Sequence, residues 1–321
     1  MNFLAYIYGA SAGARNVLYD RGVLHARKLR GPVVSVGNLS VGGSGKTPFV
    51  LLLGELLKAR GVKFDILSRG YGRQRRGVAL VDPGGSSRDF GDEPLLMARR
   101  LGVSVVVEED RYEAGVFAEN KFGAQLHLLD DGFQHRALAR DFDIVLVTPE
   151  DARDRLLPAG RLREPLTSLR RADAVVLASG AAPDSFPLNG KVVWRARRGI
   201  LPNNVPARPV VVCGIARPKN FLLQLRTAGI EPVAEAFFGD HHAYTERDIR
   251  DLLKLRQQSE AEGFVTTEKD AINLGGYLSA LEPLAIVPVK MELVDAANAV
   301  DTMLRTIEER RRGRERIAII E

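Results

Sequence analysis

The chain reads Ser40-Val41-Gly42-Gly43-Ser44-Gly45-Lys46-Thr47 between a β-branched run at 33–36 and a helical segment at 47–60. Its glycines let consecutive backbone N–H groups converge on phosphate oxygens, and the start of the following helix adds the positive end of its dipole. In such a loop the ammonium of Lys46 reaches the β- and γ-phosphates, and the hydroxyl of Thr47 binds Mg²⁺. Glycine usually begins the pattern, where this chain has Ser40. The stretch therefore predicts a nucleotide phosphate-binding loop.

Strands and helices alternate along the chain on both sides of this loop. Apolar runs typical of strands occur at 33–36, 64–67, 78–81, 103–107, 126–129, 144–147 and 174–178. Helical segments are predicted between them at 47–60, 93–101 and 110–122. Continuous apolar strands separated by helices are typical of a parallel sheet that is covered on both faces. The expected fold class is therefore α/β, with a parallel sheet core of the P-loop NTPase type.

The length of 321 residues suggests two domains, because one domain typically holds about 150 residues. Near 180–209 the composition shifts to Gly, Pro, Asn and Ala, which is typical of a connection. A second α/β pattern follows, including an expected strand at 284–289 and a helix at 295–311. The expected units are an N-terminal amphipathic helix at 1–30, a nucleotide-binding domain at 31–185, a connection at 186–208 and a smaller C-terminal α/β domain at 209–321.

The composition excludes several classes of protein. Hydrophobic residues make up 45% and charged residues 27% of the chain, which is ordinary for a globular protein. The single cysteine, Cys213, excludes an intramolecular disulfide and any site with several cysteine ligands. No uncharged apolar run reaches the roughly 18 residues of a membrane-spanning helix. We expect a protein of the cytosol, or one that lies on a membrane without crossing it.

Both ends of the chain carry clusters of basic residues, although the net charge is only +6. The arginines at 310–316 alternate with glutamates, which favours a solvated helix face. Near the N-terminus an apolar stripe at helical spacing consists of Phe3, Leu4, Ile7, Tyr8, Ser11, Ala14 and Leu18. The basic residues that follow it suit an anionic membrane surface. A helix that faces the core explains the stripe equally well, so both hypotheses stay open.

Two acids follow the predicted strand at 126–129. Asp130 and Asp131 stand where that strand ends, downstream of the phosphate loop. Acids in this position bind the Mg²⁺ of the nucleotide directly or through water. The polar residues Gln134 and His135 come shortly after, at the sheet edge where ligands of open parallel sheets bind. The pattern predicts a magnesium site beside the loop.

A second acidic pair, Asp92 and Glu93, precedes a predicted helix. These carboxylates either cap that helix or supply a catalytic base and a metal ligand beside a nucleotide. The residue pattern does not choose between the two. His241 belongs to the pair at 241–242 and is either a proton-transfer group or an ordinary loop histidine. For His241 the pattern by itself favours the ordinary histidine.

Taken together, these motifs resemble those of the tetraacyldisaccharide 4′-kinase family, the lipid A kinases. The matching segments occur in order along most of the chain and are jointly far more specific than any one motif. Ser44 stands where the family often has threonine, a mild change, and the family tolerates a residue such as Ser40. The segments that carry the resemblance are Gly37-Asn38, 41–48, 68–72, 91–94, 130–135, Leu157-Pro158-Ala159-Gly160, Leu162-Arg163-Glu164-Pro165, Asp240-His241 and 266–270.

The resemblance implies a P-loop kinase with a smaller second domain, bound peripherally to the cytoplasmic face of the bacterial inner membrane. It implies ATP and Mg²⁺ as cofactors, with the nucleotide bound by residues 40–47. The acceptor would be the 4′-hydroxyl of an acylated glucosamine disaccharide 1-phosphate, in the biosynthesis of lipid A. The N-terminal helix matches a membrane-associating helix of the family. No nucleic acid partner is expected.

The same resemblance implies individual roles. Asp92 matches the proposed catalytic base of the family, with His241 as its partner in a dyad. Lys46 would neutralise charge on the transferring phosphoryl group. The implied magnesium ligands are Thr47, Glu93, Asp130 and Asp131.

Two alternatives remain open at the level of the sequence. A P-loop kinase that acts on a soluble sugar or nucleoside would need no membrane helix, so vesicle binding would distinguish it. A nucleotide-dependent switch protein would hydrolyse ATP slowly and would yield no phospholipid product. The acids at 92–93 and the histidine pair have no obvious role in such a switch. The phosphate loop by itself does not distinguish ATP from GTP.

Overall fold

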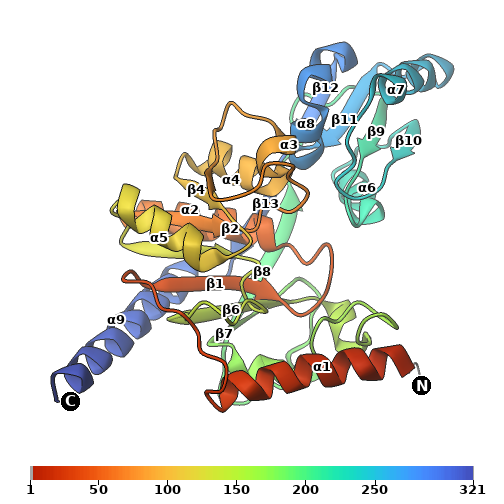
Figure 1. Cartoon of the computed structure of the whole chain (residues 1–321). Coiled ribbons are helices and arrows are strands. Elements are labelled where there is room, and N and C mark those ends of the chain that lie inside the picture. Colours follow the sequence, from red (N-terminus) through yellow and green to blue (C-terminus); the bar gives the residue numbers. More distant parts are fainter. Residues whose placement is uncertain (1–2, 321) are drawn as a thin grey trace.

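The computed structural model describes the backbone of residues 3–320 and the side chains of residues 4–314. Within this part of the chain, two β-sheets form the centres of two α/β units (Figure 1). The larger sheet has nine described strands in the order β13 (Val289–Leu293), β8 (Val192–Ile200), β7 (Ala174–Leu177), β6 (Phe142–Val147), β1 (Val33–Asn38), β5 (Leu126–Asp130), β2 (Phe64–Ser68), β4 (Val105–Val107) and β3 (Ala79–Leu80).

The larger sheet has a parallel centre. Adjacent strands from β8 to β4 all run parallel, and Val34 of β1 pairs with Leu128 of β5 on one side and Phe142 of β6 on the other. The edge strands β13 and β3 run antiparallel to their neighbours. The expected α/β fold with a parallel sheet core is therefore confirmed.

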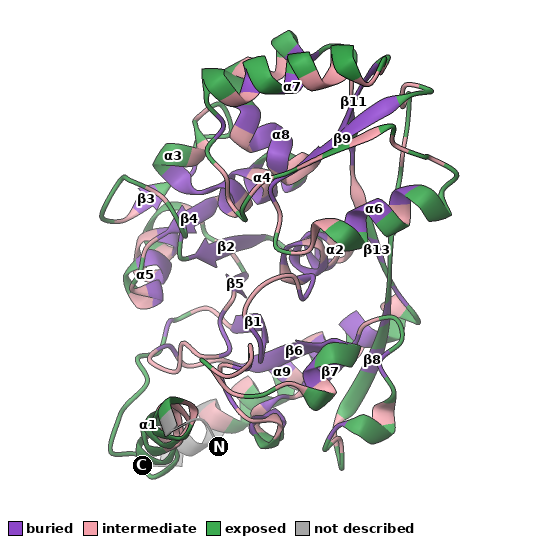
Figure 2. Cartoon of the chain, turned by 90° about the vertical axis from the view of Figure 1, so that its right-hand side faces the viewer, coloured by how far each residue is buried: buried purple, intermediate pink, exposed green. Residues whose placement is uncertain are grey.

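Helices cover both faces of the larger sheet. On one face, α2 (Lys46–Ala59), α4 (Asp92–Leu101) and α9 (Ala296–Ile320) pack against strand residues that include Val34. On the opposite face, α5 (Arg111–Lys121) packs against residues that include Val33. Successive side chains of a strand point to opposite faces, so β1 contributes to both cores. The central strands are accordingly buried, while the outer faces of the helices are exposed (Figure 2).

The smaller sheet is entirely parallel within the described chain, with the strand order β10 (Ala234–Phe237), β9 (Pro209–Cys213), β11 (Gly263–Thr267) and β12 (Leu284–Val287). One face is covered by α7 (Glu246–Gln258) and α8 (Glu268–Leu274), and the other by α6 (Pro218–Thr227). The connections of the chain contain the short helix α3 (Ser87–Phe90) and the 3₁₀ helices η1 (Pro149–Arg153), η2 (Leu166–Arg171), η3 (Pro183–Ser185) and η4 (Gly275–Leu281).

The chain passes from the larger unit to the smaller one and back again, which differs from the expected boundaries. The predicted connection at 186–208 contains β8, a strand of the larger sheet. The predicted strand at 284–289 is two strands, because Pro288 separates β12 in the smaller sheet from β13 in the larger one. β13 and α9, expected in the smaller domain, belong to the larger unit, where Val300 and Met303 are fully buried.

The N-terminal helix is shorter than expected. α1 spans Phe3–Asp20, so the prediction of a helix over 1–30 is wrong beyond Asp20, and residues 1–2 lie outside the described residues. Gly22 adopts a left-handed conformation with φ of 70°, which favours glycine and is typical of residues that follow a helix. Arg27 then forms a bridge with Leu138. The segment after Asp20 therefore leads to β1 as an irregular connection.

The apolar stripe of α1 does not face the core of the larger unit. Leu4 is 61% exposed, Ile7 49% and Leu18 40%. The opposite face of α1 contacts the protein, where the amide of Asn16 donates to Glu164 over 2.7 Å. The hypothesis of a core-facing stripe is therefore not supported. Among the described residues, no helix has the length and apolar character needed to span a membrane.

Candidate active site

The phosphate loop joins β1 to α2 at the carboxyl edge of the larger sheet. Gly42, Gly43 and Gly45 all have positive φ angles, of 73°, 62° and 85°. Residues with side chains rarely adopt this conformation, so glycine is required to turn the backbone N–H groups inward. The hydroxyl of Ser44 is buried and has no hydrogen-bond partner among the described residues. A buried, unpaired hydroxyl in a glycine-rich loop at a helix start fits an anionic ligand such as the phosphates of a nucleotide.

Lys46 occupies the end of this loop. Its ammonium donates to Oδ1 of Asn38 over 3.0 Å and lies 3.5 Å from Oδ1 of Asp131. Asp131 also accepts from Nη1 of Arg163 over 2.9 Å. Burial would raise the pKa of Asp131, but the charges of Lys46 and Arg163 outweigh burial and hold that pKa below its usual value. Two cations therefore meet at one carboxylate beside the loop.

The charge of Asp130 is compensated less completely, because the effect of Lys46 is outweighed there by burial and by neighbouring acids. It ends β5, and its Oδ2 accepts from the hydroxyl of Ser68 over 2.9 Å, while Oδ1 is buried without a partner among the described residues. Burial, followed by the nearby charges of Glu93 and Asp131, raises the pKa of Asp130 to about 7. A buried carboxylate whose charge is only partly compensated fits a bound cation.

The residues expected to bind Mg²⁺ can supply only part of its ligands, and the rest would come from a nucleotide and water. Within the described chain, no three acids, histidines or cysteines lie close enough to form a complete metal site. Mg²⁺ usually takes one or two carboxylates and completes its shell with phosphate oxygens and water. The hydroxyl of Thr47 and the carboxylates of Asp130, Asp131 and Glu93 all line the same cavity, so they match this incomplete ligand set.

Asp92 and His241 meet across the two units, although 149 residues separate them. Nδ1 of His241 lies 2.9 Å from Oδ2 and 3.0 Å from Oδ1 of Asp92. Burial opposes ionisation of both groups, yet each stabilises the charged form of the other. The pKa of Asp92 is lowered and the pKa of His241 is raised. The expected dyad is thus present as a geometric pair.

The two members of the pair differ in their access to the cavity. The side chain of Asp92 is 4% exposed, and that of His241 is 26% exposed. Asp92 also accepts from the backbone N–H of Glu93 over 2.8 Å and from the amide of Asn273 over 3.1 Å. The N-cap of α4 is Gly91, and no side chain caps the helix, so Asp92 does not take the capping role that the sequence left open. Both residues line the cavity, and His241 is the more exposed of the two.

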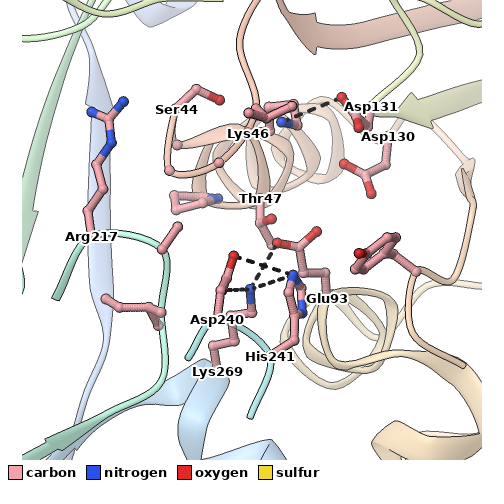
Figure 3. A pocket seen from close by; sticks show the side chains of 18 of the residues that line it. Ser44, Lys46, Thr47, Glu93, Asp130, Asp131, Arg217, Asp240, His241 and Lys269 are labelled. Carbon is pink, nitrogen blue, oxygen red and sulfur yellow. Dashed lines mark hydrogen bonds and ion pairs between the residues drawn. The ribbon is translucent and has the colours of Figure 1, made fainter. Parts of the chain in front are cut away.

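Sequence reasoning missed Lys269, which it quoted only within the motif at 266–270. Lys269 follows the carboxyl end of β11, and its ammonium lies 3.1 Å from Oδ1 of Asp240 and 3.5 Å from Oε1 of Glu93. Figure 3 shows Lys269, Asp240 and His241 on one side of the site, opposite Lys46 and Asp131. A polar side chain just after a buried parallel strand is the signal that could have identified it.

One cavity of about 930 Å³ connects all these groups. The larger unit contributes the phosphate loop and the acids, and the smaller unit contributes Asp240, His241 and Lys269. Asn38 accepts a hydrogen bond from Lys46. Helix α1 also contributes to the lining of the cavity. The residues of α1 that line it are Tyr8, Ala12, Arg15 and Asn16. The cavity is therefore lined by both units and by α1, and its volume is large enough for a nucleotide.

Comparisons with known proteins agree over nearly the whole chain. The family model described as Tetraacyldisaccharide-1-P 4'-kinase matches residues 1–308. A tetraacyldisaccharide 4'-kinase of Koribacter versatilis is 51% identical over 320 residues, which cover 97% of this chain and 99% of that protein. A tetraacyldisaccharide 4'-kinase of Aquifex aeolicus is 41% identical over 290 residues, with coverages of 85% and 89%.

A solved structure is similar over the same extent. It is the crystal structure of LpxK from Aquifex aeolicus, described as an "apo" form in complex with ATP. The TM-score is 0.78 at 38% sequence identity, and the match covers 95% of this chain and 97% of the other. The match includes both units and therefore the two sides of the cavity. On this evidence the chain belongs to the tetraacyldisaccharide-1-P 4′-kinase family.

Proposed function

We propose that this protein transfers the γ-phosphate of ATP to the 4′-hydroxyl of a tetraacylated glucosamine disaccharide 1-phosphate, in the biosynthesis of lipid A. Family membership supports the reaction. The single observation that carries the proposal is the pairing of Asp92 with His241. The ring of His241 lies opposite Lys46 of the phosphate loop (Figure 3). A proton acceptor in that place suits transfer to a hydroxyl.

The phosphate loop and its cations would bind and orient the nucleotide. Backbone N–H groups of Gly42, Gly43 and Gly45 would hold the phosphate oxygens, and Lys46 would neutralise charge on the γ-phosphoryl group. Arg163 lies beside Asp131 and supplies further positive charge. Thr47, Asp130, Asp131 and Glu93 would hold Mg²⁺, which when bound neutralises charge on the β- and γ-phosphate oxygens.

The dyad would accept the proton of the acceptor hydroxyl. A sugar hydroxyl is a weak nucleophile, so removal of its proton as the new bond forms lowers the barrier. His241 and Asp92 both line the cavity and contact each other, so the two would work as one unit. Asp92 orients the ring and stabilises the positive charge that the ring gains.

The acceptor itself would be presented by a membrane. Each CH₂ group that leaves a bilayer costs about 0.8 kcal/mol, so a tetraacylated sugar cannot be taken into water. The exposed apolar side chains of α1, including Leu4 and Ile7, and the lining of the cavity by α1 support an approach from the membrane surface. We propose that the protein is peripheral, on the cytoplasmic face of the bacterial inner membrane.

The deciding experiment incubates the purified protein with ATP, Mg²⁺ and the lipid disaccharide 1-phosphate in mixed micelles. Mass spectrometry should detect a lipid with one added phosphate, and fragmentation should place it at the 4′ position. ATP hydrolysis without a phosphorylated lipid would favour a nucleotide-dependent switch instead. Equal phosphorylation of a soluble disaccharide that lacks acyl chains would favour a kinase of soluble sugars. Parallel reactions with GTP test the choice of nucleotide.

A further inference from the structure

Lys269 is a nearly buried cation that the mechanism above does not use. Its side chain is 17% exposed, and it lies in the first turn of α8 at the boundary between the two units. Its ammonium lies 3.1 Å from Oδ1 of Asp240, 3.5 Å from Oε1 of Glu93 and 3.3 Å from Nε2 of His241 (Figure 3). Asp240 and His241 come from the smaller unit and Glu93 from the larger one. Oδ2 of Asp92 lies 3.8 Å from the same ammonium, so Lys269 faces four polar groups of the site.

The contact with His241 determines where the ring hydrogen lies. A lysine ammonium can only donate, so a contact of 3.3 Å is favourable when Nε2 of His241 presents its lone pair. The other ring nitrogen, Nδ1, lies 2.9 Å from Oδ2 of Asp92, whose carboxylate can only accept. Both contacts favour the same form of the ring, which is neutral and carries its hydrogen on Nδ1.

We propose that Lys269 is a positioning residue that selects this tautomer of His241, so that Nε2 is the atom that accepts the proton of the acceptor hydroxyl. The inference rests on the proposed kinase function. In the transfer, the acceptor oxygen forms a bond to the γ-phosphorus, and the bond from that phosphorus to the bridging oxygen breaks. The bridging oxygen keeps the electron pair and leaves as part of ADP. The hydroxyl proton passes to Nε2, and Asp92 balances the imidazolium charge.

The neighbours of Lys269 allow it to leave Nε2 during this step. Oδ2 of Asp240 lies 3.7 Å from Nε2, while Oδ1 of the same carboxylate already accepts from Lys269. A protonated Nε2 becomes a donor and can turn to Asp240 as the ammonium withdraws toward Asp240 and Glu93. The ring of Tyr71 packs on His241 with 5.3 Å between centroids, which limits rotation of the imidazole. Asp240 and Tyr71 thus hold the ring in place throughout.

Nitrogen NMR of the full-length protein tests the tautomer directly. Labelled histidine and a His241→Asn variant identify the ring signals, which are then recorded at a pH where the ring is neutral. In the wild-type protein, Nδ1 should have the chemical shift of a protonated nitrogen and Nε2 that of an unprotonated one. In Lys269→Met, which keeps the length of the side chain but removes its donors, only Asp92 still favours hydrogen on Nδ1. The two shifts should therefore move toward each other as the tautomer with hydrogen on Nε2 gains population.

Steady-state kinetics provide the second measurement. Lys269→Met should lower kcat by at least about tenfold. The reason is that His241 would then often carry its hydrogen on Nε2, where it cannot accept the proton of the acceptor hydroxyl. Calorimetric affinity for ATP should change little, since Lys269 does not hold the nucleotide in this account. Lys269→Arg keeps a donor and a charge and should recover part of the lost kcat. Lys254→Met, at a 70% exposed lysine of α7, is the matched control and should behave as wild type.

Several results would overturn the inference. One is a wild-type spectrum with the hydrogen on Nε2, and another is Lys269→Met with the wild-type tautomer and kcat. If Lys269→Met fails to fold, the spectra of the wild type and Lys269→Arg decide the question. Absence of a phosphorylated lipid in the wild-type reaction would refute the proposed function instead, whereas the tautomer is measured without any substrate.

Discussion

At the scale of single residues, two side chains of the site stand on backbone conformations that are rare outside glycine. Asp131 has φ of 48° and His241 has φ of 59°. Such conformations persist only where surrounding contacts enforce them. Arg163 and Lys46 hold the carboxylate of Asp131, and Asp92 holds the ring of His241. Two of the five described non-glycine residues with positive φ are therefore residues that the proposed mechanism uses.

Lys46 offers the simplest test at this scale. Lys46→Ala should lower kcat by orders of magnitude, because the charge of the transferring phosphoryl group loses its main compensation. The fold should persist, since the ammonium of Lys46 contacts only Asn38 and Asp131 among the described residues. Thermal unfolding and steady-state kinetics measure the two effects. Near-wild-type turnover in the folded variant would contradict the assignment of the phosphate loop.

His135 links the site to the pH dependence of stability. Burial, followed by the charge of Arg111, lowers the pKa of His135 to about 4. The ring thus stays neutral in the folded protein, whereas in the unfolded chain it takes up a proton below about pH 6.5. The unfolded state therefore binds more protons between these values, and the free energy of unfolding should fall as the pH is lowered from 7 to 4.

Urea unfolding at several pH values measures this contribution. A His135→Gln variant lacks the titrating ring, so its free energy of unfolding should depend less steeply on pH over the same interval. Nε2 of His135 has no hydrogen-bond partner among the described residues, which makes glutamine a reasonable replacement. An identical slope in both proteins would show that His135 does not titrate as the structure indicates.

At the scale of elements, α1 illustrates what periodicity can and cannot establish. The spacing of the apolar residues predicted a helix and its stripe, and α1 confirms the helix as far as Asp20. Periodicity does not say what covers the stripe, because a core and a membrane impose the same spacing. Only the position of α1 against Glu164 and Arg136 shows which face contacts the protein.

The exposed stripe gives a prediction for membrane binding. Replacing Leu4, Ile7 and Leu18 with serine should abolish co-sedimentation with anionic vesicles, because these side chains would supply the buried apolar area. The melting temperature should change little, since all three are exposed in the protein. Salt should weaken the wild-type interaction by screening the basic residues.

A matched control changes apolar residues of similar exposure elsewhere. Serine at Val192, Leu223 and Leu253, which are 40%, 64% and 39% exposed, should leave vesicle binding intact. A large fall in melting temperature of the α1 variant, with vesicle binding retained, would contradict the membrane role and show that the stripe stabilises the fold.

Strand β13 and helix α9 show a second limit of sequence patterns. Their local patterns identify a strand and a helix, but nothing in them indicates which sheet the strand joins. That choice depends on pairing with β8, where Met291 lies opposite Arg198, and on burial of Ile307 in the larger core. Tertiary contacts of this kind are non-local, so composition placed the boundary in the wrong part of the chain.

At the scale of the whole molecule, the active site exists only because the two units meet. The phosphate loop and Asp130 were predictable from local sequence, because each follows a recognisable strand. The partnership of Asp92 with His241 was not visible in the residue pattern and came from the resemblance to a family. Lys269 was missed because a lysine after a strand has many roles, and only its distances to Asp240 and His241 identify one.

The central claim is that Asp92 and His241 act as one proton-accepting unit across the two domains. The most direct test is a double-mutant cycle on kcat for lipid phosphorylation, with Asp92→Ala, His241→Ala and the double variant, each checked for folding and for ATP affinity. Each single change should lower kcat far more than ATP affinity, because the dyad acts in the transition state. The double variant should be little slower than the slower single variant, because each single change already removes the proton-accepting function of the dyad. Losses that multiply would show that the two residues act independently and would contradict the account.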